Sequence, residues 1–326
     1  MSALTPCVGL LGATGAVGDE LLRLLDDRSL PLGELRVFAS VASEGSELDF
    51  RGDEVFVEAA DSANLSSCDL LFCAAPEILR DHLDALRESG TRVVDLSGVL
   101  ELDSQVPVFH PGERPHGPWV AIPRGVVGGL ALALRPLGSL RGLTLTTLES
   151  AVGAGRSGVE ALQAQTIHVL QAMDGDAGEA GVFPQALAFD ALPQVGEFLE
   201  GGETHEERRL RHVLRRVLEQ PALRIDVMRI RIPTFMGALA SVALELEAPL
   251  GEPELSERWS KSPGLELLAA DELPTPRNAT TSEDVQIGRV RSDPRSGRLS
   301  FVLALDPLQR GAARTAIEAA RQLLAQ

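Results

Sequence analysis

The chain has 326 residues, 44% of them hydrophobic and 24% charged, and its formal net charge is −17. This length exceeds what one hydrophobic core usually supports, so we expect two domains. The acidic balance argues against nucleic acid and against an anionic membrane surface as partners, and no apolar run approaches the roughly 20 residues that span a bilayer.

Short apolar strands alternate with helical patterns over residues 1–122. The strand Cys7–Leu11 leads into a glycine-rich turn and an amphipathic helix, and a second helix is expected over 77–89. Further strands are expected at residues 35–39, 54–58, 69–74, 92–95 and 119–122. Strands that alternate with helices predict a parallel, doubly wound α/β sheet. We therefore expect a Rossmann-like dinucleotide-binding domain over residues 1–122.

The pattern changes after Pro123, where longer strands of alternating polarity appear. These strands are expected at residues 140–149, 223–233, 239–247, 285–292 and 299–305. Such alternation is typical of an antiparallel sheet with one covered face. We therefore expect an α+β domain with a mainly antiparallel sheet over residues 123–305.

Helices and loops are interleaved with the longer strands. Helices are expected at residues 157–173, 204–219 and 307–324, and loops at residues 175–181 and 251–263. The first two helices each open with a capping-box pattern, Ser157 with Glu160 and Thr204 with Glu207. In this pattern the side chains of the two residues satisfy each other's backbone N–H groups, so it marks the start of a helix.

A glycine-rich turn, Gly12–Gly18, joins the first strand to the first helix. Its glycines permit a close backbone approach, and the helix start offers N–H groups to a diphosphate. The candidate contacts in this turn are Gly12, Thr14, Gly15, Ala16, Val17 and Gly18. The acidic residue that usually binds the ribose is missing, and Ser40 and Ser43 are weaker partners in its place. Binding of NAD or NADP is one interpretation of the turn, and helix–sheet packing alone is the other.

Several motifs, in the same order along nearly the whole chain, resemble the aspartate-semialdehyde dehydrogenase family. After the glycine turn, residues 93–97 read VVDLS where the family has VVDNS, and residues 121–125 read AIPRG where it has ANPNC. Residues 152–155 read VGAG where the family has VSGAG. Further matches lie at residues 189–198, 204–209 and 231–237. Each match is loose by itself, but together they are specific.

The resemblance implies an N-terminal dinucleotide domain, a central domain that binds substrate and dimerises, and a last helix that returns to the first domain. Residues 306–326 would therefore join residues 1–122, and a homodimer is expected. The family reduces an acyl phosphate to an aldehyde with NADPH. A cysteine thiolate forms a thioester, a histidine acts as acid and base, and two arginines hold the substrate's carboxylate and phosphate. The turn near the nicotinamide falls on Ala74.

The sequence departs from the family at the reactive positions. The cysteine position is Gly125 and the histidine position is Ala238. The glutamine position is Glu149 and the phosphate-binding arginine position is Glu101, two carboxylates that we expect to repel an acyl phosphate. The arginine that reads the NADP phosphate falls on Ala42. Loss of a covalent nucleophile costs on the order of a million-fold in rate, so we expect no catalytic residues and no activity in the parent reaction.

A remnant of the substrate site is expected at Glu206, Arg209 and Arg231. Arg231 matches the carboxylate-binding arginine, and the other two match a Glu/Lys pair that contacts substrate. Arg229 and Arg231 alternate with apolar residues and share one sheet face, so a solvated face is the alternative interpretation. For Glu206 the alternative is a favourable charge at a helix N-terminus.

Two other interpretations remain open. Cys73 lies at the carboxyl end of a buried strand and could replace the missing nucleophile, although a small buried cysteine is the commoner role. A different chemistry in the retained cleft is the other interpretation. The ligand-type residues His110, Glu113 and His116 lie on a proline-rich loop, so no metal is predicted. The three cysteines have no disulfide spacing, which favours a reducing cytoplasm.

These observations together predict an inactive, dimeric relative of aspartate-semialdehyde dehydrogenase that resembles the Usg-type paralogues. Its expected role is that of a scaffold, or of a protein that binds a nucleotide or a small anionic metabolite, because a fold can persist after its chemistry is lost.

Overall fold

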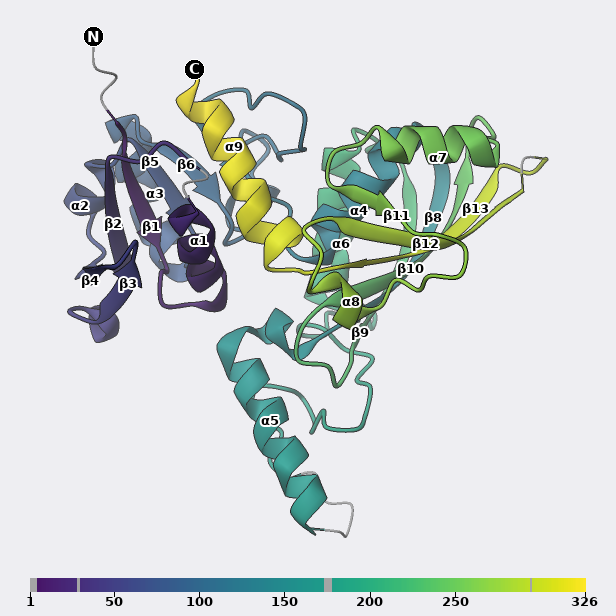
Figure 1. The fold of residues 1–326 in the computed structure, drawn as a ribbon, viewed down its shortest axis with the longest axis horizontal. Coiled ribbons are helices and arrows are strands. Elements are labelled where there is room, and N and C mark those ends of the chain that lie inside the picture. The colour runs from purple at the N-terminus through teal and green to yellow at the C-terminus, as the bar shows by residue number, and fades with distance from the viewer. Residues whose placement is uncertain (1–4, 28–29, 173–177, 294) are drawn as a thin grey trace. The chain divides into compact units, whose positions relative to one another are not determined.

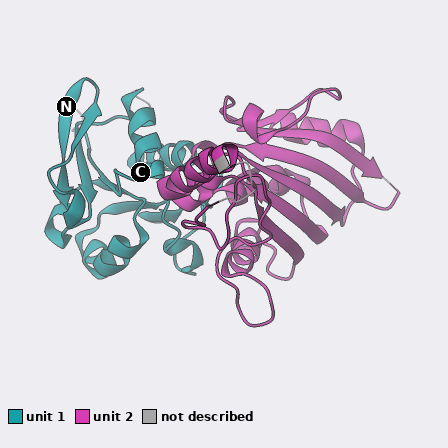
Figure 2. Cartoon of the chain, turned by 90° about the horizontal axis from the view of Figure 1, so that it is seen from below, with its two compact units in different colours: residues 1–124, 311–326 teal, residues 125–310 magenta. Residues whose placement is uncertain are grey.

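The computed structural model describes residues 5–27, 30–172, 178–293 and 295–326 (Figure 1). The chain divides into two compact units, one of residues 1–124 with 311–326 and the other of residues 125–310 (Figure 2). Each unit has its own sheet and its own hydrophobic core.

The sheet of the first unit is doubly wound, in the order β3-β4-β2-β1-β5-β6-β7. All neighbours run parallel except β3 and β4. Its strands are β1 (Cys7–Leu11), β2 (Glu34–Ala39), β3 (Glu47–Phe50), β4 (Asp53–Ala59), β5 (Leu70–Cys73), β6 (Arg92–Asp95) and β7 (Trp119–Ala121). Strand order reverses between β1 and β5, and such a switch point is where open α/β sheets bind ligands.

Helices cover both faces of this sheet. They are α1 (Ala16–Asp26), α2 (Ser62–Ser66), α3 (Pro76–Ser89) and α9 (Arg314–Leu324). Leu10 packs in a cluster with residues of α1 and α9, whereas its neighbour Leu11 packs in a second cluster with residues of α3. Successive strand residues point to opposite faces, so both faces of β1 are buried. The predicted doubly wound α/β fold is confirmed.

The sheet of the second unit has the order β11-β12-β13-β10-β8-β9. Its strands are β8 (Leu140–Glu149), β9 (Arg224–Arg231), β10 (Ala238–Leu246), β11 (Leu265–Leu267), β12 (Val285–Asp293) and β13 (Arg298–Leu305). The three inner pairings are antiparallel, and the two outer pairings, β8 with β9 and β11 with β12, are parallel. The expected α+β architecture with a mainly antiparallel sheet is therefore confirmed.

The helices of the second unit partly differ from expectation. They are α4 (Val126–Leu134), α5 (Gly155–Ala172), α6 (His205–Val217), α7 (Glu252–Ser260) and α8 (Pro276–Ala279). The Thr204–Glu207 capping box forms at α6 as predicted. The box predicted at Ser157 is wrong, because α5 begins two residues earlier and the Ser157 hydroxyl donates to the carbonyl of Ala154. In Figure 1, α5 extends away from the sheet of its unit.

Two further expectations need correction. Residues 251–263 contain helix α7 rather than a loop, and the indole N–H of its Trp259 donates to the Ala133 carbonyl of α4 at 2.9 Å. The last helix is regular only from Arg314, because a π-helical turn spans Gln309–Ala313. Of the loop predicted at residues 175–181, residues 178–181 form no helix or strand, as expected, and residues 175–177 lie outside the described residues. Within the described ranges, no helix has both the length and the apolar character needed to cross a bilayer.

Candidate functional site

The glycine turn after β1 contains three glycines that have different structural roles. Gly12 has φ +90°, which an L side chain rarely adopts, and a Cβ on it would lie 3.0 Å from the backbone of Ala74. A Cβ on Gly18 would lie 2.2 Å from the Gly12 carbonyl oxygen, so this glycine lets α1 pack against the turn. Packing therefore explains Gly12 and Gly18.

Gly15 has no comparable packing role. It has φ −86°, it is exposed, and the nearest contact of a Cβ there would be 3.5 Å. It is the N-cap residue of α1, and among the described residues no side-chain hydrogen bond caps the start of this helix. The first N–H groups of α1 thus lie behind a residue without a side chain, an arrangement that suits an approaching phosphate.

The other predicted nucleotide contacts follow neighbouring strands. Ser40 follows β2, is exposed, and precedes a 3₁₀ turn that contains Ser43. Ala74 follows β5, and its N–H donates to the carbonyl of Leu11 at 2.8 Å. Because β2, β1 and β5 are adjacent and parallel, these residues and the glycine turn lie at one edge of the sheet, at the switch point.

Cys73 ends β5 and is completely buried. Burial raises the pKa of its thiol well above the usual value, and electrostatic interactions with Asp95 and Cys68 raise it further. A thiol attacks as the thiolate, so this environment suppresses reactivity. The geometry therefore argues against Cys73 as a replacement nucleophile.

The VVDLS motif forms a buried turn. The carboxylate of Asp95 accepts hydrogen bonds from the N–H groups of Ser97 and Leu100, both at 2.7 Å, and from the Ser97 hydroxyl. Burial raises the pKa of Asp95 despite these bonds. The turn carries Glu101, which is fully buried.

Glu101 does not present a free carboxylate. Its Oε1 accepts a hydrogen bond from the backbone N–H of Arg124 at 2.7 Å, and its Oε2 lies 3.7 Å from Nε of the same arginine. Arg124 therefore offsets part of the negative charge with which we expected Glu101 to repel an anion. The carboxylate instead holds the residue that precedes the central turn.

The central turn places Gly125 at the N-cap of α4, with φ 59° and ψ −132°. This conformation is strained for any residue with a side chain. Within the described part of its own unit, no heavy atom beyond the chain neighbours lies within 4 Å of the Cβ position. The turn thus has room for a side chain and has none.

Ala238 begins β10 and lies in a row of residues across the sheet. It pairs with Glu149 of β8, and Glu149 pairs with Arg231 of β9. Residues paired directly across strands project from the same face. The predicted histidine, glutamine and arginine positions are therefore neighbours, and all three side chains are nearly buried.

A buried ionic network surrounds this row. The guanidinium of Arg229 binds both carboxylate oxygens of Glu149, each at 2.7 Å, and also Oε2 of Glu206 at 2.9 Å. Arg209 donates to the same Glu206 oxygen at 3.0 Å. Burial alone raises the pKa of Glu149, but the facing Arg229 outweighs it and holds the pKa below its usual value. Glu149 is thus a paired anion, and Arg229 offsets the charge with which we expected it to repel ligands.

Arg231 is held differently. Its side chain is buried, and Nη1 donates to the carbonyl of Ser150 at 2.7 Å. In the described residues no carboxylate lies within ion-pairing distance of it, and burial lowers the pKa of its guanidinium. A buried cation without an ionic partner is costly unless an anion joins it. Both arginines are buried, so the alternative of a solvated sheet face is wrong.

Sequence reasoning missed the central member of this network. Arg229 lies on the correct face by its alternation with Arg231, but its partner Glu149 is 80 residues away in the chain. Glu207 was expected only as a capping residue, yet its Oε1 also accepts the N–H of Arg229 at 3.1 Å. In the described residues, no group of three or more His, Cys, Asp or Glu side chains could hold a metal ion.

Comparison with known proteins agrees with this architecture. Residues 7–116 match the NAD binding domain of semialdehyde dehydrogenases, and residues 131–310 match their dimerisation domain. The chain belongs to the aspartate-semialdehyde dehydrogenase family. The central turn with Gly125 lies between the two matched ranges.

Individual members of the aspartate-semialdehyde dehydrogenase family align over nearly the full chain. Aspartate-semialdehyde dehydrogenase 2 of Vibrio cholerae is 30% identical over 97% of both chains, and a USG-1 protein homolog of Azotobacter vinelandii is 32% identical over 98% of both. The crystal structure of the Vibrio cholerae enzyme II complexed with ASA superposes with a TM-score of 0.92 at 27% identity and covers 99% of each chain.

Proposed function

We propose that this protein is a homodimeric member of the aspartate-semialdehyde dehydrogenase family that does not catalyse the thioester reaction and binds ligands instead. The main support for this proposal is the central turn, where Gly125 occupies an open position at the start of α4 and offers no nucleophile. Ala238 offers no acid or base in the neighbouring row. With glycine and alanine at these two positions, neither side chain can attack an acyl group or transfer a proton.

The proposed ligands are a small carboxylate at Arg231 and a nucleotide at the glycine turn. The buried guanidinium of Arg231 lacks an ionic partner among the described residues, which favours an anion in the same row. At the glycine turn, Gly15 leaves the α1 N-terminus accessible, although packing does not require a glycine there. The match to an NAD binding domain supports a dinucleotide, NAD or NADP, as the nucleotide.

The homodimer is proposed from the match of residues 131–310 to a dimerisation domain. We also propose that residues 1–122 with 306–326 act as the nucleotide-binding part and residues 123–305 as the anion-binding and dimerising part. A cytoplasmic location follows from the composition and the cysteine usage.

Activity is tested with aspartate semialdehyde, inorganic phosphate and either NAD or NADP, by following the absorbance of the reduced cofactor. We expect no turnover above that of a heat-denatured sample. Turnover that persists in purified protein and disappears in the Arg231→Met variant would show that the site is catalytic, and the proposal would be wrong.

Binding is tested separately by calorimetric titration with NAD, NADP and aspartate. We expect heat from at least one dinucleotide and from aspartate, and we expect the aspartate signal to be lost in Arg231→Met. If none of the three titrations gives a binding heat, the proposal that the protein binds these ligands is wrong.

A further inference from the structure

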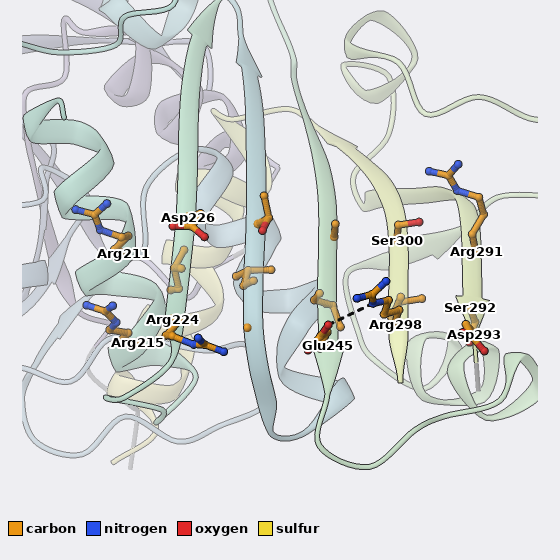
Figure 3. Close-up of a pocket in the computed structure, with 17 residues that line it drawn as sticks. Arg211, Arg215, Arg224, Asp226, Glu245, Arg291, Ser292, Asp293, Arg298 and Ser300 are labelled. Carbon is orange, nitrogen blue, oxygen red and sulfur yellow. Dashed lines mark hydrogen bonds and ion pairs between the residues drawn. The ribbon is translucent and has the colours of Figure 1, made fainter. Parts of the chain in front are cut away.

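A broad hollow on the second sheet is lined by arginines, carboxylates and hydroxyls (Figure 3). All of the residues that line it lie within the range matched to the dimerisation domain, so the homodimer proposed above accounts for this surface. The first unit carries a different feature, a pair of neighbouring cysteines that has no part in the proposed function.

Cys7 and Cys68 are distant in the sequence but adjacent in the fold. Cys7 begins β1, and Cys68 lies two residues before β5, the neighbouring strand. The N–H of Asp69 donates to the carbonyl of Cys7 at 2.9 Å, and the N–H of Cys7 donates to Oδ2 of Asp69 at 2.8 Å. Since Asp69 directly follows Cys68, these two bonds hold the backbones of the two cysteines side by side.

The sulfur atoms of the two cysteines lie over the same face of β1. The side chain of Cys7 projects from the face on which Gly9 lies, because the two residues are two positions apart on the strand. A Cβ on Gly9 would lie 2.8 Å from Sγ of Cys68, so the Cys68 thiol occupies the space over Gly9, next to Cys7. Both cysteines pack in the same hydrophobic cluster, and their thiols hydrogen-bond to each other.

The two thiols differ in access and in acidity. Cys7 is half-buried, whereas Cys68 is 4% exposed. Burial raises the pKa of Cys7, but the hydrogen bond with Cys68 acts in the opposite direction. Burial and the contact with Cys7 together raise the pKa of Cys68 to about 12. An oxidant in solution therefore reaches Cys7 first, and Cys68 is a shielded partner that reacts with a group already beside it.

A guanidinium lies beside the two thiols. Arg36 of β2 is paired with Gly9, so its side chain projects from the same sheet face. Nη1 of Arg36 and Sγ of Cys68 both donate to the carbonyl of Asn64, at 3.4 and 3.9 Å. The positive charge opposes the effect of burial on the pKa of both thiols, although Glu58, which binds the guanidinium, offsets part of this charge. A cation beside a cysteine favours the thiolate, the form that oxidants attack.

We infer that Cys7 and Cys68 form a reversible disulfide when the protein meets a peroxide. In the first step the Cys7 thiolate attacks one oxygen of hydrogen peroxide, the O–O bond breaks, and a sulfenic acid forms while the released hydroxide takes up the thiol proton as water. In the second step the Cys68 sulfur attacks the sulfenic sulfur, the S–S bond forms and the S–O bond breaks. The hydroxyl leaves with the Cys68 proton as a second water. The two thiols thus lose two electrons, which reduce the peroxide.

The disulfide would join the amino ends of β1 and β5, the strands on either side of the switch point. The glycine turn lies at the other end of β1, so the bond would not obstruct it. A cross-link between residues distant in the sequence restricts the unfolded chain, so the oxidised protein should unfold at a higher temperature than the reduced one. In a reducing compartment the bond would last only while the oxidant is present.

The test treats the folded protein with a small excess of hydrogen peroxide, blocks the remaining thiols with iodoacetamide and maps the non-reduced peptides by mass spectrometry. We expect a linked pair of peptides that contains Cys7 and Cys68, with a mass lower than their sum by two hydrogen atoms. Dithiothreitol should separate the pair. The melting temperature should rise by about 5 °C on oxidation and return on reduction.

Two variants separate the roles of the cysteines. Cys73→Ala removes the fully buried thiol outside the pair and should give the same linked peptides as the original chain. Cys68→Ala removes only the second step, so dimedone should capture about tenfold more sulfenic acid at Cys7 than in the original chain. The inference is wrong if no such peptide pair forms, if it links two different chains, or if the melting temperature does not rise. Equal dimedone labelling of the original chain and Cys68→Ala would also contradict it.

Discussion

The carboxylate of Glu149 and the guanidinium of Arg229 form a buried two-point ion pair, with both N···O distances at 2.7 Å. The pair joins β8 to β9, with Glu149 directly across from Arg231 and Arg229 two positions before Arg231 on β9. Paired in this way, Glu149 does not neutralise Arg231 through a hydrogen bond. The guanidinium of Arg231 instead donates to the carbonyl of Ser150, and the charges of Glu149 and Glu206 act on it without direct contact.

Removal of the arginine from this pair should be strongly destabilising. Arg229→Met leaves Glu149 charged and buried, and we expect a loss of about 3–5 kcal/mol in the free energy of unfolding. The double variant Glu149→Gln/Arg229→Met removes the unpaired charge and should lose less. Urea unfolding of both variants measures the difference, and equal losses would contradict the assigned pairing.

The same pair predicts an acid-dependent stability. The pKa of Glu149 is lowered in the folded protein, from 4.5 in the unfolded chain. Its contribution to the free energy of unfolding is therefore complete above pH 4.5. The contribution is lost as the pH falls below 4.5 through the folded pKa. The difference in unfolding free energy between the original chain and Glu149→Gln should therefore shrink from about pH 4.5 downward. A difference that is constant down to about pH 3 would contradict this prediction.

A side chain at the central turn should cost stability without restoring chemistry. Because Gly125 has φ 59° and ψ −132°, Gly125→Ala and Gly125→Cys should each lose about 1–3 kcal/mol. Thermal unfolding measures the loss. Gly125→Ala adds a side chain without sulfur, so an equal loss in both variants would attribute it to backbone strain. We expect no turnover from Gly125→Cys, since Ala238 supplies no base.

The cysteines should differ in reactivity toward a thiol reagent. Cys73 is fully buried with a raised pKa, and burial raises the pKa of Cys68 to about 12. Cys7 is only partly buried. Brief treatment of the folded protein with iodoacetamide, followed by peptide mass mapping, should label Cys7 first and Cys73 last. Preferential labelling of Cys73 would contradict this order and would support Cys73 as a candidate nucleophile.

Gly153 provides a way to move Arg231 without removing its charge. A Cβ at this position would lie 2.4 Å from Nη1 of Arg231, so Gly153→Ala must displace the guanidinium. We expect aspartate affinity to fall about tenfold with little change in melting temperature, because the displaced atoms end a flexible side chain. Gly142→Ala, at a position with open space, serves as the matched control in the same titration.

The sequence predicts local structure well where a signal lies within a few residues. Thr204 and Glu207 are three positions apart, and their capping box forms as expected. The same pattern at Ser157 fails because the chain is already helical from Gly155. Helix α7 was missed because its flanking prolines and glycines resemble a loop, while its anchor, the contact of Trp259 with Ala133, is 126 residues away in sequence.

The candidate site shows the same limit. Its arginine and glutamate positions were found through motifs, but the way charges compensate one another was not. From the sequence alone, Glu101 and Glu149 were expected to repel an anionic ligand. In the fold, an arginine lies beside each of them. Such pairings depend on strand register and on turns that no short pattern encodes.

The adjacency of Ala238 and Glu149 determines the surroundings of any side chain placed at position 238. An imidazole introduced at position 238 would lie beside a carboxylate that is already paired with Arg229, and this pairing weakens the effect of Glu149 on the pKa of the imidazole. Replacing Glu149 by a neutral residue would in turn leave Arg229 without its two-point partner. The residues at positions 238, 149 and 229 are therefore coupled, and a change at one of them alters the environment of the other two.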